Sequence, residues 1–233
     1  MVSPESFGIW QLIPSPVVTS VLLSRDLEFV IVDFEHGGFD ITTLVNSVFA
    51  AKALNKSIFA RVPTYASDLI PQILDANVDG ILFAHVNKTS DAINAANTMS
   101  FAPEGKRSYT PYSYAFLYNH PSRYPPQQRL GLLLESLEGI SQLANMIENI
   151  KIDFVYFGAY DLSSEIGRSG DIFCSELLAL LEDVATKCAQ AKIPLWALAT
   201  KPDDILLLKS LGVNVIVMGV DTGLIANAAS IPL

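Results

Sequence analysis

Short apolar segments recur along the whole chain, each rich in β-branched or aromatic residues and bounded by charged residues, glycine or proline. Uniformly apolar segments of this kind are typical of strands buried on both faces of a parallel sheet. The pattern predicts eight strands, at Phe7–Gln11, Glu28–Asp33, Ser57–Arg61, Gly80–His85, Leu130–Glu135, Asp153–Phe157, Pro194–Leu198 and Asn214–Gly219.

Amphipathic helical patterns separate these strands. Apolar residues recur at helical spacing from Ile140 to Ile150 and from Leu177 to Cys188, so one face of each segment can pack against a sheet. The segment Thr200–Asp203 reads as a capping box with an early proline, and it predicts a helix that ends at Gly212.

The alternation of strands and helices predicts an α/β protein. Eight repeats in 233 residues indicate a (β/α)₈ barrel, with residues 1–233 forming one domain. A doubly wound open sheet is the alternative. It is disfavoured because no Gly-x-Gly-x-x-Gly motif follows the first strand.

One segment, Phe101–Arg129, breaks this alternation. It has no clear periodicity and is rich in proline and tyrosine. Irregular segments of such length are uncommon inside compact domains and usually have a function. We expect an ordered loop at the mouth of an active site or at a subunit interface, and a lid without chemistry is the alternative.

Composition narrows the class of protein. Half of the residues are hydrophobic, 17% are charged and the formal net charge is −9. No cluster of lysine and arginine stands out, which argues against binding to nucleic acid. No apolar segment is long enough to span a membrane, and the start of the chain lacks the pattern of a secretory signal.

The two cysteines, Cys174 and Cys188, are expected on one helix, too far apart to form a disulfide. The absence of a disulfide framework fits a reducing compartment, and we expect a cytoplasmic protein.

Charged residues stand where four of the predicted strands end, which is where barrel enzymes place their active sites. Glu135 ends one strand, and Asp161 follows the next. Two facing carboxylates repel unless a proton or a cation neutralises them, and oxygen-only ligands favour Mg²⁺ or Mn²⁺. The alternative is that each carboxylate caps the helix that follows it.

His36 lies three residues after Asp33, just past a strand. The carboxylate could orient the imidazole and raise its basicity, so that His36 acts as a general base. The alternative is a histidine that only caps the loop through Gly37 and Gly38. His85 and His120 are weaker candidates for the same role.

Arg61 ends another strand, where its guanidinium could bind a substrate carboxylate with two hydrogen bonds. An ion pair with Asp33, Glu35 or Asp75 is the alternative. Lys106 and Arg107 form a small cationic patch that could bind a second anion or simply belong to a solvated turn.

Taken in order, these segments resemble the HpcH/HpaI aldolase family, which includes class II pyruvate aldolases and is related to the citrate lyase β-subunit. The similarity spans nearly the whole chain. The matching segments are Phe7–Trp10, Val32–His36, Ala60–Pro63, Gln72–Asp75, Pro103–Ser108, Leu134–Gly139, Gly158–Ser163 and Gly219–Thr222.

The resemblance implies a metal-dependent carbon–carbon lyase on a (β/α)₈ barrel, with Mg²⁺, Mn²⁺ or Co²⁺ held by Glu135 and Asp161. A 2-oxo acid such as pyruvate would chelate the metal, with an aldehyde as the second substrate. Arg61 would stabilise the enolate oxygen, and His36, oriented by Asp33, would transfer protons.

The resemblance also implies an oligomer. Asp75 would support the base from a neighbouring subunit, in a hexamer built as a trimer of dimers with exchanged C-terminal helices. The chain begins almost at its first strand, so we expect a partner to cover the barrel bottom, which a helix covers in the family, or the bottom to stay exposed.

Residues at the expected substrate pocket depart from the family pattern. Leu133 stands where many pyruvate aldolases carry glutamine, and Ala159 and Tyr160 precede the expected metal ligand Asp161. Tyr160 would crowd the aldehyde pocket. Two alternatives therefore stay open: a condensing or cleaving enzyme that uses an acyl-CoA, with the cationic patch on its phosphates, and a non-catalytic homologue.

Overall fold

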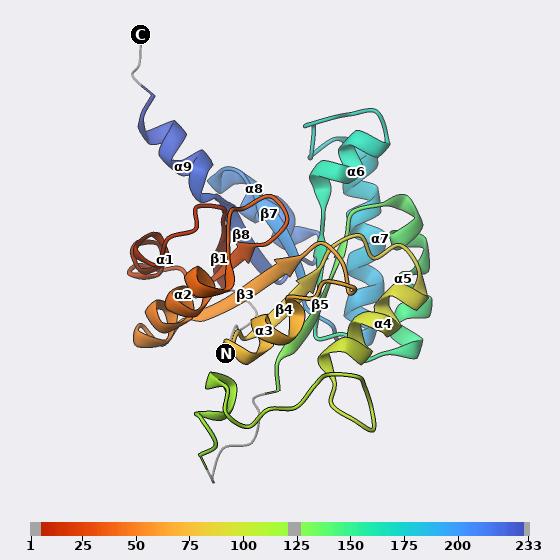
Figure 1. Ribbon diagram of the computed structural model, residues 1–233. Coiled ribbons are helices and arrows are strands. Elements are labelled where there is room, and N and C mark those ends of the chain that lie inside the picture. Colours follow the sequence, from red (N-terminus) through yellow and green to blue (C-terminus); the bar gives the residue numbers. More distant parts are fainter. Residues whose placement is uncertain (1–5, 121–126, 231–233) are drawn as a thin grey trace.

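A computed structural model describes residues 6–120 and 127–230 of the chain. Eight parallel strands pair in sequence order and close into a barrel, with the helices outside it (Figure 1). This arrangement confirms the predicted (β/α)₈ barrel. The strands are β1 (Phe7–Gln11), β2 (Phe29–Asp33), β3 (Ser57–Val62), β4 (Gly80–Phe83), β5 (Arg129–Leu134), β6 (Phe154–Phe157), β7 (Leu195–Ala199) and β8 (Val215–Val220).

Helices connect the strands and cover the outside of the barrel (Figure 1). Two helices, α6 and α7, follow β6, and a short 3₁₀ helix, η1, precedes β5. The helices are α1 (Pro16–Leu23), α2 (Ile41–Ala53), α3 (Ile70–Asp75), α4 (Thr89–Met99), η1 (Tyr114–Phe116), α5 (Leu137–Asn149), α6 (Ala159–Glu165), α7 (Ser175–Ala191), α8 (Pro202–Ser210) and α9 (Asp221–Ala228).

Helix starts differ in detail from the sequence prediction. The capping box of α8 uses Lys201 and Asp204, and not Thr200 with Asp203; the Asp204 carboxylate accepts hydrogen bonds from the backbone N–H groups of Thr200 and Lys201. Cys174 lies just before α7 as its N-cap, so only Cys188 is on the helix, and both cysteines are free.

Aromatic rings fill the half of the barrel nearest the strand starts. Trp196 stacks on Phe154 with ring centroids 4.1 Å apart and contacts the rings of Phe29 and Phe59. All four side chains are almost completely buried. Glycine makes room for them: a Cβ at Gly131 would lie 2.2 Å from the Phe154 ring. This half of the barrel is solid core, which leaves the carboxyl ends of the strands for a site.

The long segment after α4 lies at the amino end of the barrel. Its described parts, residues 100–120 and 127–128, come between α4 and β5, and in Figure 1 the part that follows α4 lies below the barrel, opposite α6 and α9. Gln128 fixes its end by donating to the carbonyl oxygens of Leu74 and Val78. The prediction of a loop at the active-site mouth is therefore wrong, because a segment that joins a helix to the next strand sits at the opposite end.

Arg107 of the predicted cationic patch is buried at this amino end. Its guanidinium pairs with Asp75 at 3.0 Å, donates to Gln128 and lies 4.5 Å over the Phe101 ring. Lys106 beside it is exposed. The two residues therefore do not form a joint anion site near the carboxyl ends of the strands.

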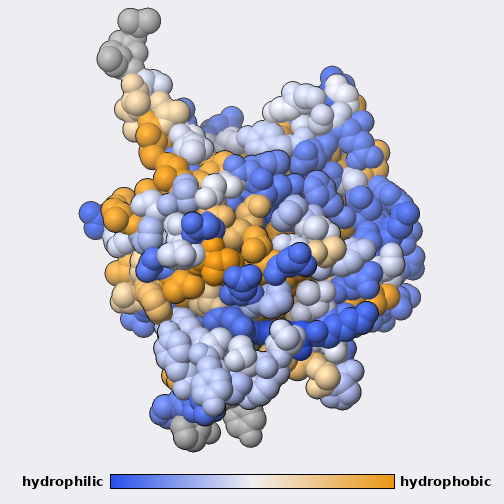
Figure 2. All heavy atoms as spheres, in the orientation of Figure 1, coloured by the Kyte–Doolittle hydropathy of each residue, from blue (hydrophilic) through white to orange (hydrophobic). Residues whose placement is uncertain are grey.

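Helix α9 projects away from the barrel (Figure 1), and Figure 2 shows hydrophobic residues gathered along it. Its residues Leu224 and Ile225 expose 49% and 55% of their surface. At its start, the Asp221 carboxylate accepts hydrogen bonds from the backbone N–H groups of Leu12 and Ile13, which ties α9 to the segment after β1. Within the described ranges, no helix has the length and hydropathy needed to cross a lipid bilayer.

Candidate active site

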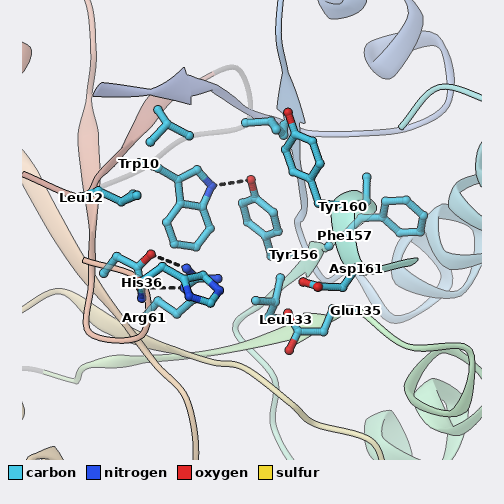
Figure 3. Close-up of a pocket in the computed structure, with 15 residues that line it drawn as sticks. Trp10, Leu12, His36, Arg61, Leu133, Glu135, Tyr156, Phe157, Tyr160 and Asp161 are labelled. Carbon is cyan, nitrogen blue, oxygen red and sulfur yellow. Dashed lines mark hydrogen bonds and ion pairs between the residues drawn. The ribbon is translucent and has the colours of Figure 1, made fainter. Parts of the chain in front are cut away.

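A cavity of about 320 Å³ opens at the carboxyl end of the barrel (Figure 3). Its walls come from the ends of strands that are far apart in the sequence. Eight of the nine residues predicted for the site line it: Asp33, His36, Arg61, Leu133, Glu135, Ala159, Tyr160 and Asp161. The exception is Asp75, which lies with Arg107 at the amino end of the barrel.

Glu135 directly follows β5, and Asp161 lies in the first turn of α6, which follows the neighbouring strand β6. Figure 3 shows their carboxylates close together at the cavity. Neither is a helix cap. The N-cap of α5 is Ser136, whose hydroxyl accepts from the Gly139 N–H, and the N-cap of α6 is Gly158. The capping alternative is therefore not what the structure has, and both carboxylates face the cavity.

Gly158 makes this proximity possible, because a Cβ there would lie 2.7 Å from the Cβ of Glu135. The backbone at the end of β6 can thus approach Glu135 closely, and Asp161 follows Gly158 by three residues.

Burial raises the pKa of the Glu135 carboxyl, and the charges of Asp161 and Glu35 raise it further. Hydrogen bonding and charge from His85 offset part of this rise. A cation between the two carboxylates would remove the repulsion, and their oxygen-only chemistry suits Mg²⁺, which keeps several waters and binds through one or two carboxylates. These two residues therefore fit a divalent metal, although the described residues contain no cluster of three or more such ligands.

Arg61 is held from two sides by carboxylates. Its guanidinium makes a double hydrogen bond with Asp33, and one nitrogen lies 3.3 Å from Glu35. Burial lowers the pKa of the guanidinium, but Asp33 and Glu35 outweigh this effect, so the pKa is raised and Arg61 stays charged. The ion pair that was the alternative for Arg61 is thus present, and Arg61 still lines the cavity.

The predicted contact between the Asp33 carboxylate and the His36 ring is absent. Asp33 and Arg61 are register partners on β2 and β3, so the carboxylate is occupied by the guanidinium and by the backbone N–H groups of Glu35 and His36. Asp33 therefore stabilises the loop that carries His36 through backbone hydrogen bonds and makes no hydrogen bond to the His36 ring. Gly37 lets this loop turn tightly, because a Cβ would lie 2.4 Å from the Asp33 carbonyl oxygen.

His85 takes a central position that the sequence suggested only weakly. It has a left-handed backbone, with φ of 53°, two residues after β4. Its backbone N–H donates to Glu135 Oε1 at 2.6 Å, and its Nδ1 lies 3.0 Å from the same oxygen. Its Nε2 lies 2.6 Å from Glu35 Oε1. A continuous chain of polar contacts thus links Arg61, through Glu35 and His85, to Glu135.

Trp10 and Tyr156 form the floor of the cavity, and sequence reasoning missed both. The Trp10 indole N–H donates to the Tyr156 hydroxyl at 2.7 Å, and the rings meet edge to face at 5.3 Å (Figure 3). Arg61 lies 4.7 Å over the Trp10 ring. Alternation along β1 and β6 places both side chains inside the barrel, and this pattern could have identified them.

Tyr160 stands at the rim of the cavity. It exposes 53% of its surface, so it leaves the interior open and does not fill the space beside Glu135 and Asp161. Leu133 supplies apolar wall deeper in the cavity, where it is the register partner of Tyr156.

Residues 6–228 match a family model described as HpcH/HpaI aldolase/citrate lyase. A 5-keto-4-deoxy-D-glucarate aldolase from Enterobacter sp. (strain 638) is 24% identical over 225 residues, which cover 95% of this chain and 88% of the relative. A hydroxypyruvate/pyruvate aldolase from Roseovarius nubinhibens is 23% identical over 227 residues, again 95% of this chain and 88% of the relative.

Solved structures share the fold. A family protein from Burkholderia cenocepacia J2315 superposes with a TM-score of 0.89 at 20% identity, covering 96% of this chain and 91% of the other. A citrate lyase β-subunit from M. tuberculosis, solved with oxaloacetate and magnesium, gives 0.60 at 13% identity, covering 97% and 94%. Magnesium binding therefore occurs among proteins of this fold.

Proposed function

Because the chain belongs to the HpcH/HpaI aldolase/citrate lyase family, we propose that it is a divalent-metal-dependent aldolase acting through the enolate of a 2-oxo acid. The observation that carries the proposal is the cavity that gathers His36, Arg61, Glu135 and Asp161 from distant parts of the chain. The distant relatives that are pyruvate-type aldolases support the same reaction class.

In cleavage of a 4-hydroxy-2-oxo acid, His36 takes the proton of the C4 hydroxyl, directly or through one water. The C3–C4 bond then breaks, an aldehyde leaves, and the bonding electrons move into the enolate. Arg61 faces that enolate oxygen with a fixed positive charge, and His36 returns the proton to C3. Electrostatic stabilisation of this kind is most effective in a buried cavity that excludes water.

Glu135 and Asp161 would hold the metal, most suitably Mg²⁺, with Mn²⁺ or Co²⁺ as substitutes. When bound, a divalent cation supplies Lewis-acid stabilisation of the negative charge that develops on the substrate. His85 contacts Oε1 of Glu135 through its backbone N–H and its ring, so it would help to orient this carboxylate toward the ion.

The test is exchange of the methyl protons of pyruvate with deuterium, followed by NMR, because exchange needs only the 2-oxo acid. We expect exchange with Mg²⁺ or Mn²⁺, its loss with EDTA and its return when metal is added. A purified, folded protein that binds no divalent ion and exchanges no pyruvate protons would contradict the proposal.

The position of Lys106 and Arg107 counts against the acyl-CoA alternative within one chain. Arg107 is buried against Asp75 at the amino end of the barrel, so the patch cannot hold CoA phosphates beside the cavity of its own chain. Release of free thiol from acetyl-CoA and oxaloacetate is the assay that would favour that alternative.

We further propose that the chain forms a homo-oligomer, a hexamer built as a trimer of dimers, with α9 exchanged between subunits. The exposed apolar side chains of the projecting α9 support this proposal. Asp75, remote from the cavity of its own chain, would then serve a neighbour's site. Native mass spectrometry tests the assembly: monomers at micromolar concentration would contradict it, and Leu224→Asp should weaken it.

A further inference from the structure

The Tyr156 hydroxyl can donate a hydrogen bond for which the described residues provide no acceptor. It accepts from the Trp10 indole N–H at 2.7 Å, and no described residue accepts its own proton. A tyrosine hydroxyl has one proton to donate, and a buried donor without a partner costs roughly 1–3 kcal/mol. The side chain lines the cavity, so water or a molecule bound there can accept that proton.

The hydroxyl is a lasting donor. Complete burial raises the pKa of Tyr156 well above its usual value, so it stays protonated across the physiological pH range. The Trp10 N–H fills one lone pair of the oxygen and restricts where the remaining proton can point.

Apolar side chains line the cavity together with this hydroxyl. Leu133 is the register partner of Tyr156 on β5, and Leu12, Leu198 and Val220 also line the cavity. A neutral donor among apolar side chains discriminates between a ligand oxygen and a methyl group. Arg61, Glu135 and Asp161 supply the charged part of the lining.

We propose that Tyr156 is a specificity-determining residue that donates to an oxygen on C3 of the substrate, so the preferred 2-oxo acid is 3-hydroxylated. This inference rests on the proposed function, in which Arg61 faces the keto oxygen. Arg61 lies over the ring of Trp10, and Trp10 bonds to Tyr156. C3 is two bonds from the keto oxygen that Arg61 would face, so a substituent on C3 would lie beside the floor formed by Trp10 and Tyr156.

The experiment compares two substrates in two proteins. 3-Hydroxypyruvate and 2-oxobutyrate have nearly the same shape and differ by a hydroxyl in place of a methyl group. Exchange of their C3 protons with deuterium is measured by NMR for the wild type and for Tyr156→Phe, with Mg²⁺ present. Intrinsic differences in acidity cancel because the ratio of the two substrates is compared between the proteins.

We expect Tyr156→Phe to lower kcat/KM for 3-hydroxypyruvate about fivefold to tenfold relative to 2-oxobutyrate, the size of one neutral hydrogen bond. An equal loss with both substrates would mean that the hydroxyl only supports Trp10, and would overturn the proposal. Tyr112→Phe makes the same chemical change at an exposed tyrosine at the amino end and should leave the ratio unchanged.

Binding of the two acids, measured by calorimetry, separates this proposal from the function on which it rests. If neither acid exchanges protons but the wild type still binds 3-hydroxypyruvate better and Tyr156→Phe does not, the aldolase function fails and the role of Tyr156 stands. If binding shows no difference between the proteins, the role of Tyr156 is wrong whatever the exchange result.

Discussion

The two ends of the barrel interior are built from opposite kinds of side chain. At the amino end, Phe29, Phe59, Phe154 and Trp196 fill the space with rings in contact. At the carboxyl end, charged side chains line an open cavity and neutralise one another in pairs. The comparison teaches that one end of the barrel supplies stability and the other holds the charged groups that a ligand in the cavity would meet.

The largest effect is expected at the amino end. Trp196→Ala removes the ring at the centre of the aromatic cluster and leaves a cavity, so the free energy of unfolding should fall by about 3–5 kcal/mol. Urea denaturation measures it. A loss below about 1 kcal/mol would show that the cluster collapses around the gap or contributes little.

The next effect is expected at the carboxyl end and should change activity more than stability. Asp161→Asn removes the charge of an exposed carboxylate from the proposed metal site. Metal stabilisation of a developing charge is worth several kcal/mol, so pyruvate proton exchange should fall by roughly a hundredfold to a thousandfold. Thermal unfolding of the metal-free variant should stay close to that of the wild type. Full activity in the variant would exclude Asp161 as a ligand.

A smaller effect is expected from His85, which contacts Glu135 without facing the metal position itself. His85→Ala removes the ring contact to Glu135 Oε1 and breaks the link to Glu35, while the backbone N–H bond to Oε1 remains, so the affinity for Mn²⁺ should fall about tenfold to a hundredfold. Calorimetric titration with Mn²⁺ measures the affinity. His85→Asn, which restores a side-chain donor, should recover part of the loss.

The smallest effect is expected from Glu135→Gln, which should stabilise the fold, whereas most substitutions of buried residues destabilise it. The pKa of Glu135 is raised in the fold, so the native state holds this proton more tightly than the unfolded chain does. Its contribution to stability is therefore greatest below the unfolded pKa and falls as the pH rises through the folded pKa. In EDTA at pH 7, Glu135→Gln should melt at a slightly higher temperature than the wild type, with no gain at pH 4. A lower melting temperature at pH 7 would contradict the unfavourable burial and repulsion inferred for the Glu135 carboxylate.

Much of the fold was predictable because each buried strand is a short apolar segment that can be recognised in the local sequence. The segment Phe7–Gln11 is a strand with the bounds predicted, and apolar residues also located the other strands. The ends were less certain: β4 stops at Phe83, so His85 lies in a turn with a left-handed backbone, and apolar patterning does not encode that change.

The contacts within the site were less predictable than its members. Asp33 meets Arg61 and not the His36 ring because of the register between β2 and β3, and a register is a property of two strands together. Trp10 and Tyr156 look like ordinary core residues until the closed barrel brings them into contact across 146 positions. The misplaced loop was an error of connectivity, since a segment that joins α4 to β5 has to lie at the amino end.

The hydrogen bonds from Leu12 and Ile13 to Asp221 close the seam where the barrel begins and ends. There β1 and β8 are parallel neighbours, so a force that pulls the two chain ends apart loads this seam along the strand axes. The ladder is then sheared as a unit, and its bonds cannot open one after another. In a single-molecule pulling experiment the seam should resist as a mechanical clamp, with Asp221→Ala lowering the rupture force.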